Sequence, residues 1–129
     1  MRAEELKGHL DAVLLAALEG GPRHGYAVIE SLRQSTDGRL DLPTGTIYPA
    51  LRRLEQAGLI AGTWSVVGGR RRREYRLTPA GVRALSGRRA AWRDFAATVT
   101  AALESATLGN AALENAALED TACPSPNPA

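Results

Sequence analysis

The sequence contains 129 residues, which is enough for one compact domain with a modest hydrophobic core and an attached helix or tail. It contains no apolar run of about 18 residues and no basic leader followed by an apolar segment, so we expect a cytoplasmic protein without membrane association. The only cysteine is Cys123, which excludes an intrachain disulfide and a multi-cysteine zinc site, and we expect no metal or cofactor.

Charge is distributed unevenly along the chain. The formal net charge of +2 combines 16 Lys and Arg residues with 14 Asp and Glu residues. All 16 basic residues lie between Arg2 and Arg93, whereas the segment from Glu104 to Asp120 carries four acidic residues and no basic one. A basic body predicts a polyanionic partner, which in the cytosol is usually nucleic acid. Because a GC-rich genome also favours arginine, the charge alone leaves this question open.

Two short amphipathic helices are predicted in the first part of the chain. From His9 to Leu18 the apolar residues recur at helical spacing, and Gly20 to Pro22 ends the helix. A second helix of about three turns is predicted from His24 to Gln34 and is followed by a polar run. We expect His24 to have a structural role at the start of this helix, because the chain has only two histidines and no neighbouring ligand cluster.

A third helix is predicted to end near Ala57, with Thr44 or Thr46 as its N-cap. Pro49 lacks an N–H group, so we expect it in or near the first turn. The face opposite the apolar stripe carries Arg52 and Gln56, whose side chains can form paired hydrogen bonds with guanine and adenine, respectively.

Further polar residues on or beside this face are suited to DNA phosphates, which position a protein without specifying sequence. This group comprises Thr44, Thr46, Tyr48 and Arg53. The two tyrosines Tyr26 and Tyr48 are equally consistent with packing and with phosphate contact.

A β-hairpin is predicted after the third helix. The apolar stretch Leu59 to Val66 and the stretch Arg73 to Leu77 flank a glycine turn with a cationic tip at 67–72. The run Arg70, Arg71, Arg72 and Arg73 is either a solvated loop or a DNA contact, and its place after a recognition-helix pattern favours DNA contact. We expect Trp64 to pack in the core beneath the hairpin.

A long helix is predicted from Pro79 to Glu104, with Thr78 as N-cap and proline at the first helical position. Its apolar residues are spaced 7, 3, 4 and 4 apart, close to a coiled-coil seam, which predicts packing against a second copy of the chain. The predicted homodimer interface comprises Leu10, Leu14, Leu85, Trp92, Phe95, Val99 and Leu103. Trp92 and Phe95 are either dimer core or a binding site for a small planar aromatic effector.

Residues 105–129 are repetitive and end in a proline-rich stretch. Ala-Ala-Leu-Glu occurs at 101–104, 111–114 and 116–119. The five-residue spacing of the last two copies matches neither a helix face nor strand alternation, so we predict a frayed helix followed by a disordered tail.

The order of these elements predicts a mainly α-helical fold with a small β-hairpin. We expect residues 1–78 to form a winged helix-turn-helix domain that binds double-stranded DNA and residues 79–104 to form a dimerisation helix. The sequence contains no set of nucleophile, base and orienting residue and no phosphate-binding glycine loop, so we do not expect an enzyme. A winged-helix module that binds another protein is the alternative function, and a gel-shift experiment distinguishes the two.

Four stretches of the chain carry a recognisable pattern. They are Leu14 to Leu18 followed by Gly-Pro-Arg-His-Gly-Tyr at 21–26, Gly-Thr-Ile-Tyr-Pro-Ala-Leu-Arg-Arg-Leu-Glu at 45–55, Gly-Leu-Ile at 58–60 and Arg-Arg-Glu-Tyr-Arg-Leu-Thr-Pro-Ala-Gly at 72–81. With these stretches the chain resembles the PadR-like family of transcription regulators over about residues 9–104. The resemblance implies a dimeric regulator, often a repressor, that binds a roughly palindromic operator through the third helix and the wing. It also implies dimerisation through the C-terminal helix and, in some members, release by a ligand.

Overall fold

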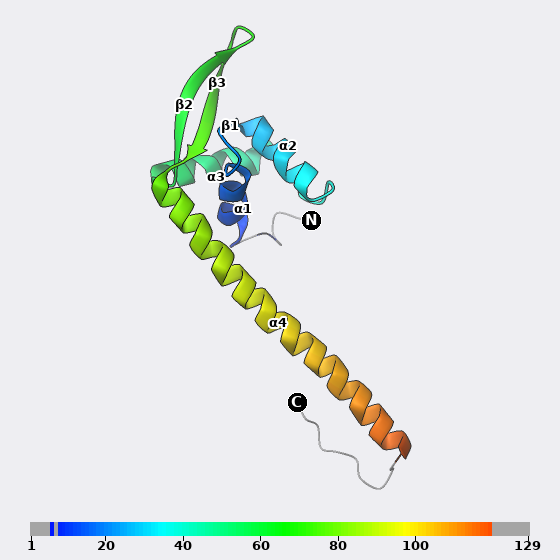
Figure 1. The fold of residues 1–129 in the computed structure, drawn as a ribbon. Helices are drawn as coiled ribbons and strands as arrows, with labels where there is room; N and C mark the ends of the chain where they lie inside the picture. Colours follow the sequence, from blue (N-terminus) through cyan, green and yellow to red (C-terminus); the bar gives the residue numbers. More distant parts are fainter. Residues whose placement is uncertain (1–5, 7, 120–129) are drawn as a thin grey trace. The chain divides into compact units, whose positions relative to one another are not determined.

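The computed structural model describes residues 6 and 8–119, with side chains through residue 105. In chain order the elements are α1 (Leu10–Ala17), β1 (Arg23–His24), α2 (Gly25–Ser35), α3 (Thr44–Gln56), β2 (Ile60–Val67), β3 (Arg70–Leu77) and α4 (Pro79–Glu119) (Figure 1). This order confirms the mainly α-helical fold with a small β-hairpin that the sequence predicts. Cys123 lies outside the described residues.

The first three helices surround one hydrophobic core. Each helix contributes its apolar stripe, and the base of the hairpin and the first turns of α4 cover the remaining sides. The largest fully buried side chains are Leu14, Leu15, Val28, Ile47, Leu51, Leu54 and Ile60. Complete burial of a side chain of this size contributes about 1.5–3 kcal/mol, so this cluster is what holds α3 in place.

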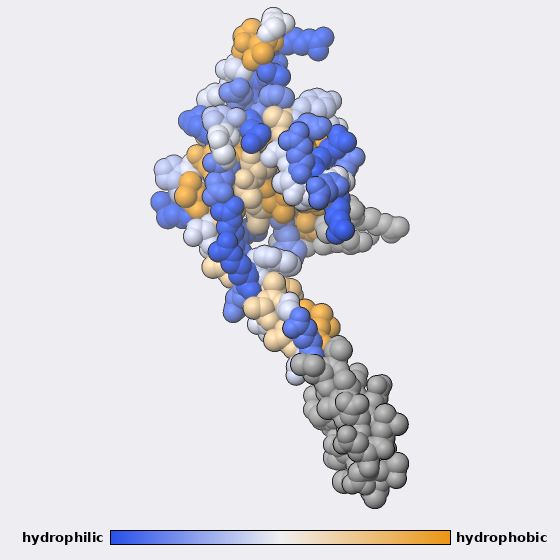
Figure 2. All heavy atoms as spheres, turned by 45° about the vertical axis from the view of Figure 1, so that its right-hand side comes forward, coloured by the Kyte–Doolittle hydropathy of each residue, from blue (hydrophilic) through white to orange (hydrophobic). Residues whose placement is uncertain are grey.

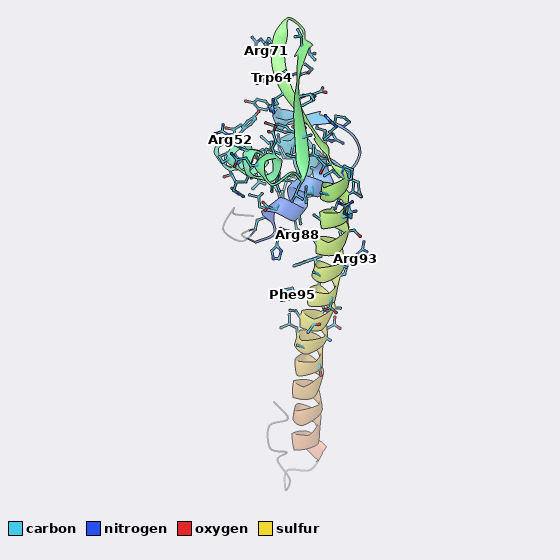
Figure 3. All side chains as sticks on the ribbon, turned by 90° about the vertical axis from the view of Figure 1, so that its left-hand side faces the viewer. Arg52, Trp64, Arg71, Arg88, Arg93 and Phe95 are labelled. Carbon is cyan, nitrogen blue, oxygen red and sulfur yellow. The ribbon has the colours of Figure 1, made fainter. Side chains whose placement is uncertain are left out.

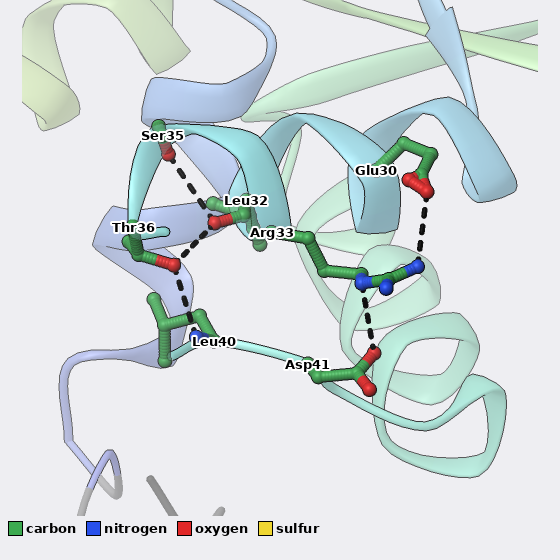
Figure 4. A network of polar contacts seen from close by, with 7 residues as sticks. All are labelled: Glu30, Leu32, Arg33, Ser35, Thr36, Leu40 and Asp41. Atoms are coloured by element: carbon green, nitrogen blue, oxygen red, sulfur yellow. Dashed lines mark hydrogen bonds and ion pairs between the residues drawn. The ribbon is translucent and has the colours of Figure 1, made fainter. Parts of the chain in front are cut away.

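Polar contacts at the end of α2 shape the loop that leads into α3 (Figure 4). The carbonyl oxygen of Leu32 accepts hydrogen bonds from Ser35 Oγ at 3.3 Å and from Thr36 Oγ1 at 2.6 Å. Thr36 Oγ1 in turn accepts a hydrogen bond from the amide of Leu40 at 2.9 Å. Because the last carbonyls of a helix have no partner within the helix, these hydroxyl groups satisfy one of them and tie the loop to the helix end.

The hairpin belongs to a three-stranded antiparallel sheet of order β1-β3-β2. Arg23 pairs with Tyr75 and His24 with Glu74, so β1 forms the edge strand beside β3. The sequence predicted only the two strands of the hairpin. A two-residue strand that leads directly into a helix has no periodicity of its own, and only its pairing with the distant β3 defines it.

The start of α3 differs from the prediction. Pro43 is the N-cap residue, and its carbonyl oxygen accepts hydrogen bonds from the amides of Thr46 at 2.9 Å and Ile47 at 3.1 Å. No side chain caps the helix, so the expectation that Thr44 or Thr46 is the N-cap is wrong. Pro49 therefore lies in the second turn, where it leaves the carbonyl oxygen of Gly45 without its usual i+4 donor.

The start of α4 agrees with the prediction. Thr78 Oγ1 accepts a hydrogen bond from the amide of Gly81 at 3.1 Å and donates one to the carbonyl oxygen of Gly58 at 2.6 Å. The helix continues to Glu119, past the predicted end at Glu104. Alanine, leucine and glutamate are strong helix formers, so the repeats favour a helical backbone although their spacing builds no continuous apolar face. No described helix combines the length and the apolar character that crossing a membrane requires.

The chain divides into two units, and the boundary between them lies between Arg89 and Ala90. Within the first unit, Leu14 and Leu85 are buried in the core formed by their own chain, and Leu10 packs against that core. The sequence predicted that Leu14 and Leu85 are buried by a second subunit, whereas their own chain already buries them. In the second unit the remaining residues of the predicted seam are exposed: Trp92, Phe95, Val99 and Leu103.

Candidate nucleic-acid interface

One side of α3 is buried and the opposite side faces solvent. Ile47, Leu51 and Leu54 are buried in the core. The helical repeat therefore turns Arg52 and Gln56 outward, and both are exposed. Figure 3 shows Arg52 on the outer side of α3. This placement is the geometry that a helix needs to present side chains to base edges in a major groove.

Arg53 is exposed as well, but it has a partner within the chain. Its Nη2 atom donates a hydrogen bond to Asp11 Oδ1 of α1 at 3.3 Å. An exposed ion pair of this kind is worth about 0–1 kcal/mol, so Arg53 can exchange Asp11 for a phosphate at little cost. The ion pair nevertheless orients the side chain toward α1 in the absence of DNA.

The register of the hairpin determines which side chains share a face. Ile60 faces Leu77, Gly62 faces Tyr75, Trp64 faces Arg73 and Val66 faces Arg71. Because side chains alternate along a strand, these four pairs lie on one side of the hairpin. The side begins with buried Ile60 at the core and becomes aromatic and cationic toward the tip.

Trp64 is not part of the core, contrary to the prediction. Its side chain is 59% exposed, and the guanidinium carbons of Arg71 and Arg73 lie 4.6 Å and 5.4 Å from the centre of its rings. Trp64 lies four residues further along β2 than the buried Ile60, and there its ring contacts arginines of β3. Such cation–π contacts are worth about 0.5–1 kcal/mol at exposed sites.

Arg73 also forms an ion pair with Glu55 of α3, through its Nη2 atom and the Oε2 atom of the carboxylate. This hydrogen bond holds the pKa of Arg73 above its ordinary value, against a smaller opposing effect of desolvation. The sequence predicted Arg73 as a DNA contact and did not identify Glu55. One feature of the sequence could have indicated the pair: Glu55 is an acidic residue beside Arg52 and Arg53, in a part of the third helix that is otherwise basic.

His24 caps α2, which confirms its predicted structural role. Its Nδ1 atom accepts a hydrogen bond from the amide of Ala27 at 3.4 Å. Its Nε2 atom lies 3.1 Å from Nη1 of Arg72, so the cap also contacts the hairpin.

Tyr48 packs against the start of α2. A Cβ atom added at Gly25 would lie 2.5 Å from the phenol of Tyr48, so the absence of a side chain at Gly25 makes room for the ring. Desolvation, and to a smaller extent the nearby Tyr26, raise the pKa of Tyr48. Its hydroxyl therefore remains a hydrogen-bond donor at neutral pH. Burial also raises the pKa of Tyr75, with a further contribution from Glu55.

A cleft of about 700 Å³ lies between the start of α2, the outer side of α3 and the hairpin. Six of the predicted DNA-binding residues line it: Tyr48, Arg52, Arg70, Arg71, Arg72 and Arg73. The other four do not line it: Thr44, Thr46, Arg53 and Gln56. Glu55 is the acidic residue among the lining residues, and it is paired with Arg73. The cleft is therefore cationic and suited to a polyanion.

The outer end of the hairpin is mixed in character. Figure 2 shows a largely hydrophilic surface along the hairpin with an apolar patch near its tip. The exposed valines of this region are Val66 and Val67. The part of the chain that the structure describes holds no group of three or more His, Cys, Asp or Glu residues that could bind a metal ion.

Comparison with known proteins identifies related chains. Residues 14–87 match the model of the transcriptional regulator PadR-like family. The chain is 43% identical over 77 residues to the transcriptional regulator Rv3488 of Mycobacterium tuberculosis, a match that covers 60% of this chain and 59% of that protein. The matched region therefore spans somewhat more than half the length of that relative.

Solved structures show the same fold. A PadR family transcriptional regulator from Eggerthella lenta has a TM-score of 0.70 and 34% identity, covering 79% of this chain and 88% of the other. A transcriptional regulator from Clostridium thermocellum has a TM-score of 0.70 and 27% identity, covering 75% of this chain and 95% of the other. The fold, the cationic cleft and the match over more than half of the chain lead to one conclusion: this protein belongs to the PadR-like family of transcriptional regulators.

Proposed function

We propose that this DNA-binding regulator is a repressor that acts in the cytoplasm as a homodimer on a palindromic operator. In this proposal α3 of each subunit enters a major groove, and the two grooves lie about one helical turn apart. Arginines near the tip of the hairpin contact the phosphate backbone or enter the adjacent minor groove.

The observation that carries this proposal is a set of exposed arginines on two neighbouring elements, α3 and the hairpin. Arg52 on α3 and Arg70 and Arg71 on the hairpin are exposed. Among the described residues, none of these three arginines forms an ion pair. Family membership supports DNA binding and leaves no reason to expect an enzyme.

The test is a titration of fluorescently labelled duplexes, selected from a random pool by the parent protein, and read by anisotropy. Arg52→Ala should weaken binding by about 1–3 kcal/mol and relax preference at one base pair per half-site. Arg71→Ala should weaken all sequences alike and reduce the salt dependence.

Arg83→Ala is the matched control, because Arg83 is an exposed arginine on α4 that does not line the cleft. Equal binding by the parent, Arg52→Ala and Arg71→Ala at moderate salt would refute the assignment of these residues.

The proposed dimer interface is the exposed apolar seam of the second unit. Trp92, Phe95 and Leu103 each expose more than half of their side chains, although they recur on one helix at a spacing typical of helix–helix packing. If a second subunit fully buries Trp92, Trp92→Ala should cost about 3–5 kcal/mol of dimer stability. Sedimentation equilibrium should then show dissociation at concentrations where the parent remains dimeric. A parent protein that is monomeric at high concentration would contradict the proposal.

We also propose that a small planar aromatic effector releases the repressor from DNA by binding at Trp92 and Phe95. The centroids of the two rings lie 5.9 Å apart and the ring planes are tilted by 37°. This separation is in the range at which aromatic rings attract each other, so the pair offers aromatic surface to a planar ligand. An effector shifts DNA affinity only by its differential affinity for the two subunit arrangements.

In a Trp64→Phe background, quenching of Trp92 fluorescence by a panel of planar aromatic compounds should coincide with operator release. Phe95→Leu serves as the comparison, because it keeps an apolar side chain and removes one ring. If no compound alters operator binding while Trp92→Ala disrupts the dimer, the aromatic pair is dimer core alone.

A further inference from the structure

Arg73 differs from its neighbours in the arginine run of the hairpin. Its side chain is only 30% exposed and pairs with Glu55, whose side chain is 28% exposed. Arg71, on the same face of the hairpin, is exposed and forms no ion pair among the described residues. The pair joins β3 to α3, and these are the two elements that the proposed function brings to the same DNA duplex.

Three neighbours hold the guanidinium of Arg73 in place. Glu55 binds it from α3, and the rings of Trp64 flank it from the paired position on β2. Gly62 lies two residues before Trp64, and a Cβ atom there would lie 2.5 Å from Nε of Arg73. The guanidinium therefore occupies the space that a side chain at position 62 would fill.

A hairpin that is attached at its base can change its angle relative to the helices, and here β1 and His24 supply contacts with β3 besides those at the base. A contact further along the strand restricts that angle, and a charge-assisted hydrogen bond is among the stronger contacts available. A restricted angle matters for DNA binding, because two sites on one protein reinforce each other only when both can engage the same partner.

We propose that Arg73 is a positioning residue: through its ion pair with Glu55 it sets the angle between the hairpin and α3, so that Arg52 and Arg71 reach one duplex together. Arg73 itself makes no phosphate contact. This inference rests on the proposed DNA-binding function. It has one specific consequence: Glu55, an acidic residue on α3, strengthens DNA binding.

Removal of Glu55 gives the sharpest test. An acidic residue near DNA normally weakens binding, so simple electrostatics predicts that Glu55→Ala binds a duplex more tightly than the parent. The positioning role predicts weaker binding, by about tenfold, a small part of the roughly 10²–10⁴-fold that simultaneous engagement supplies. Glu30→Ala is the matched control, because Glu30 also pairs with an arginine, Arg33, but within α2 and outside the cleft.

The salt dependence separates positioning from phosphate contact. Each lost phosphate contact lowers the slope of log K against log salt concentration by about 0.9. Arg71→Ala should lower the slope, whereas Arg73→Ala should weaken binding about tenfold at an unchanged slope. Gly62→Ala keeps every charge and displaces the guanidinium, so it should also weaken binding at an unchanged slope.

The experiment uses the full-length chain and duplexes selected from a random pool by the parent protein, with anisotropy measured over a range of KCl concentrations. Thermal unfolding of each variant checks that it is folded. The exchanged pair, Glu55→Arg with Arg73→Glu, should recover at least part of the affinity that each single exchange loses.

Tighter binding by Glu55→Ala, or a slope for Arg73→Ala that falls as it does for Arg71→Ala, would overturn the positioning role. Unchanged binding by Arg73→Ala would overturn it as well. A parent protein that binds no duplex would instead refute the proposed function, so the two failures are distinguishable.

Discussion

Gly81 and Gly87 lie on the same helix, and we predict opposite effects when each is replaced by alanine. Replacing glycine by alanine inside a helix normally stabilises it by about 1 kcal/mol. Gly87 is exposed, and a Cβ atom there would meet nothing within 4 Å. Gly87→Ala should therefore raise the free energy of unfolding by about 0.5–1 kcal/mol.

Gly81 is buried, and a Cβ atom there would overlap the carbonyl oxygen of Leu59. That oxygen is a backbone atom, and it accepts a hydrogen bond from the amide of Thr78 at 3.1 Å. Overpacking costs about 1–3 kcal/mol, and loss of this hydrogen bond adds about 0.5–1.5 kcal/mol. After about 1 kcal/mol for the gain in helix propensity is subtracted, Gly81→Ala should lower the free energy of unfolding by about 0.5–3.5 kcal/mol.

Urea unfolding followed by far-ultraviolet circular dichroism measures both variants. All samples need the same protein concentration, because the proposed dimerisation would make the measured stability depend on concentration. If Gly81→Ala is as stable as Gly87→Ala, the backbone of α4 at Gly81 does not lie close to the carbonyl oxygen of Leu59. The described packing of the first turn of α4 would then be wrong.

Three further predictions concern the first unit and the repetitive segment. Hydrogen bonds of 2.7 Å from Arg89 hold the pKa of Glu19 below its ordinary value of 4.5. The ion pair therefore stabilises the fold at pH values above 4.5, and this stabilisation is lost as the carboxylate is protonated at lower pH. The difference in melting temperature between the parent and Glu19→Gln should accordingly shrink as the pH falls from about 6 to about 3. A constant difference over that range would contradict this account. His24→Ala should destabilise the protein by about 1 kcal/mol in urea unfolding, whereas His24→Asn should retain most of the stability, because asparagine also accepts a hydrogen bond at an N-cap; equal loss in both variants would show that the contact with Arg72 matters more than the cap. Truncation after Ser105 should leave folding and DNA binding intact, and a truncated chain that light scattering finds monomeric beside a dimeric parent would count against this prediction.

Much of the fold follows from local patterns in the sequence. The apolar stripes of α1, α2 and α3, the glycine turn of the hairpin and the threonine and proline at the start of α4 each determine structure within a few residues. The outward position of Arg52 follows in the same way, because burial of Ile47 and Leu51 leaves only one orientation for the helix. Such features depend on spacing along the chain, and spacing is visible in the sequence.

The misassigned residues are those whose surroundings come from distant parts of the chain. Trp64 looked like a core residue because tryptophan is large and apolar, but the length of β2 carries it beyond the helices. Leu85 fitted a coiled-coil seam, yet the packing of α4 on its own core buries it. In both cases burial depends on which elements meet, and residue type alone does not determine that.

The arginines of the hairpin show the division most clearly. The sequence alone predicted a cationic stretch at Arg70 to Arg73 after the third helix, because composition and order suffice for that, but it placed Arg70 to Arg72 in the hairpin tip and not in β3. Only the tertiary structure distinguished them: strand register places Arg73 beside Trp64, and the docking of β3 near α3 brings it to Glu55, 18 positions earlier in the chain. An ion pair between residues so far apart depends on the path of the chain in space, so four adjacent arginines have different surroundings.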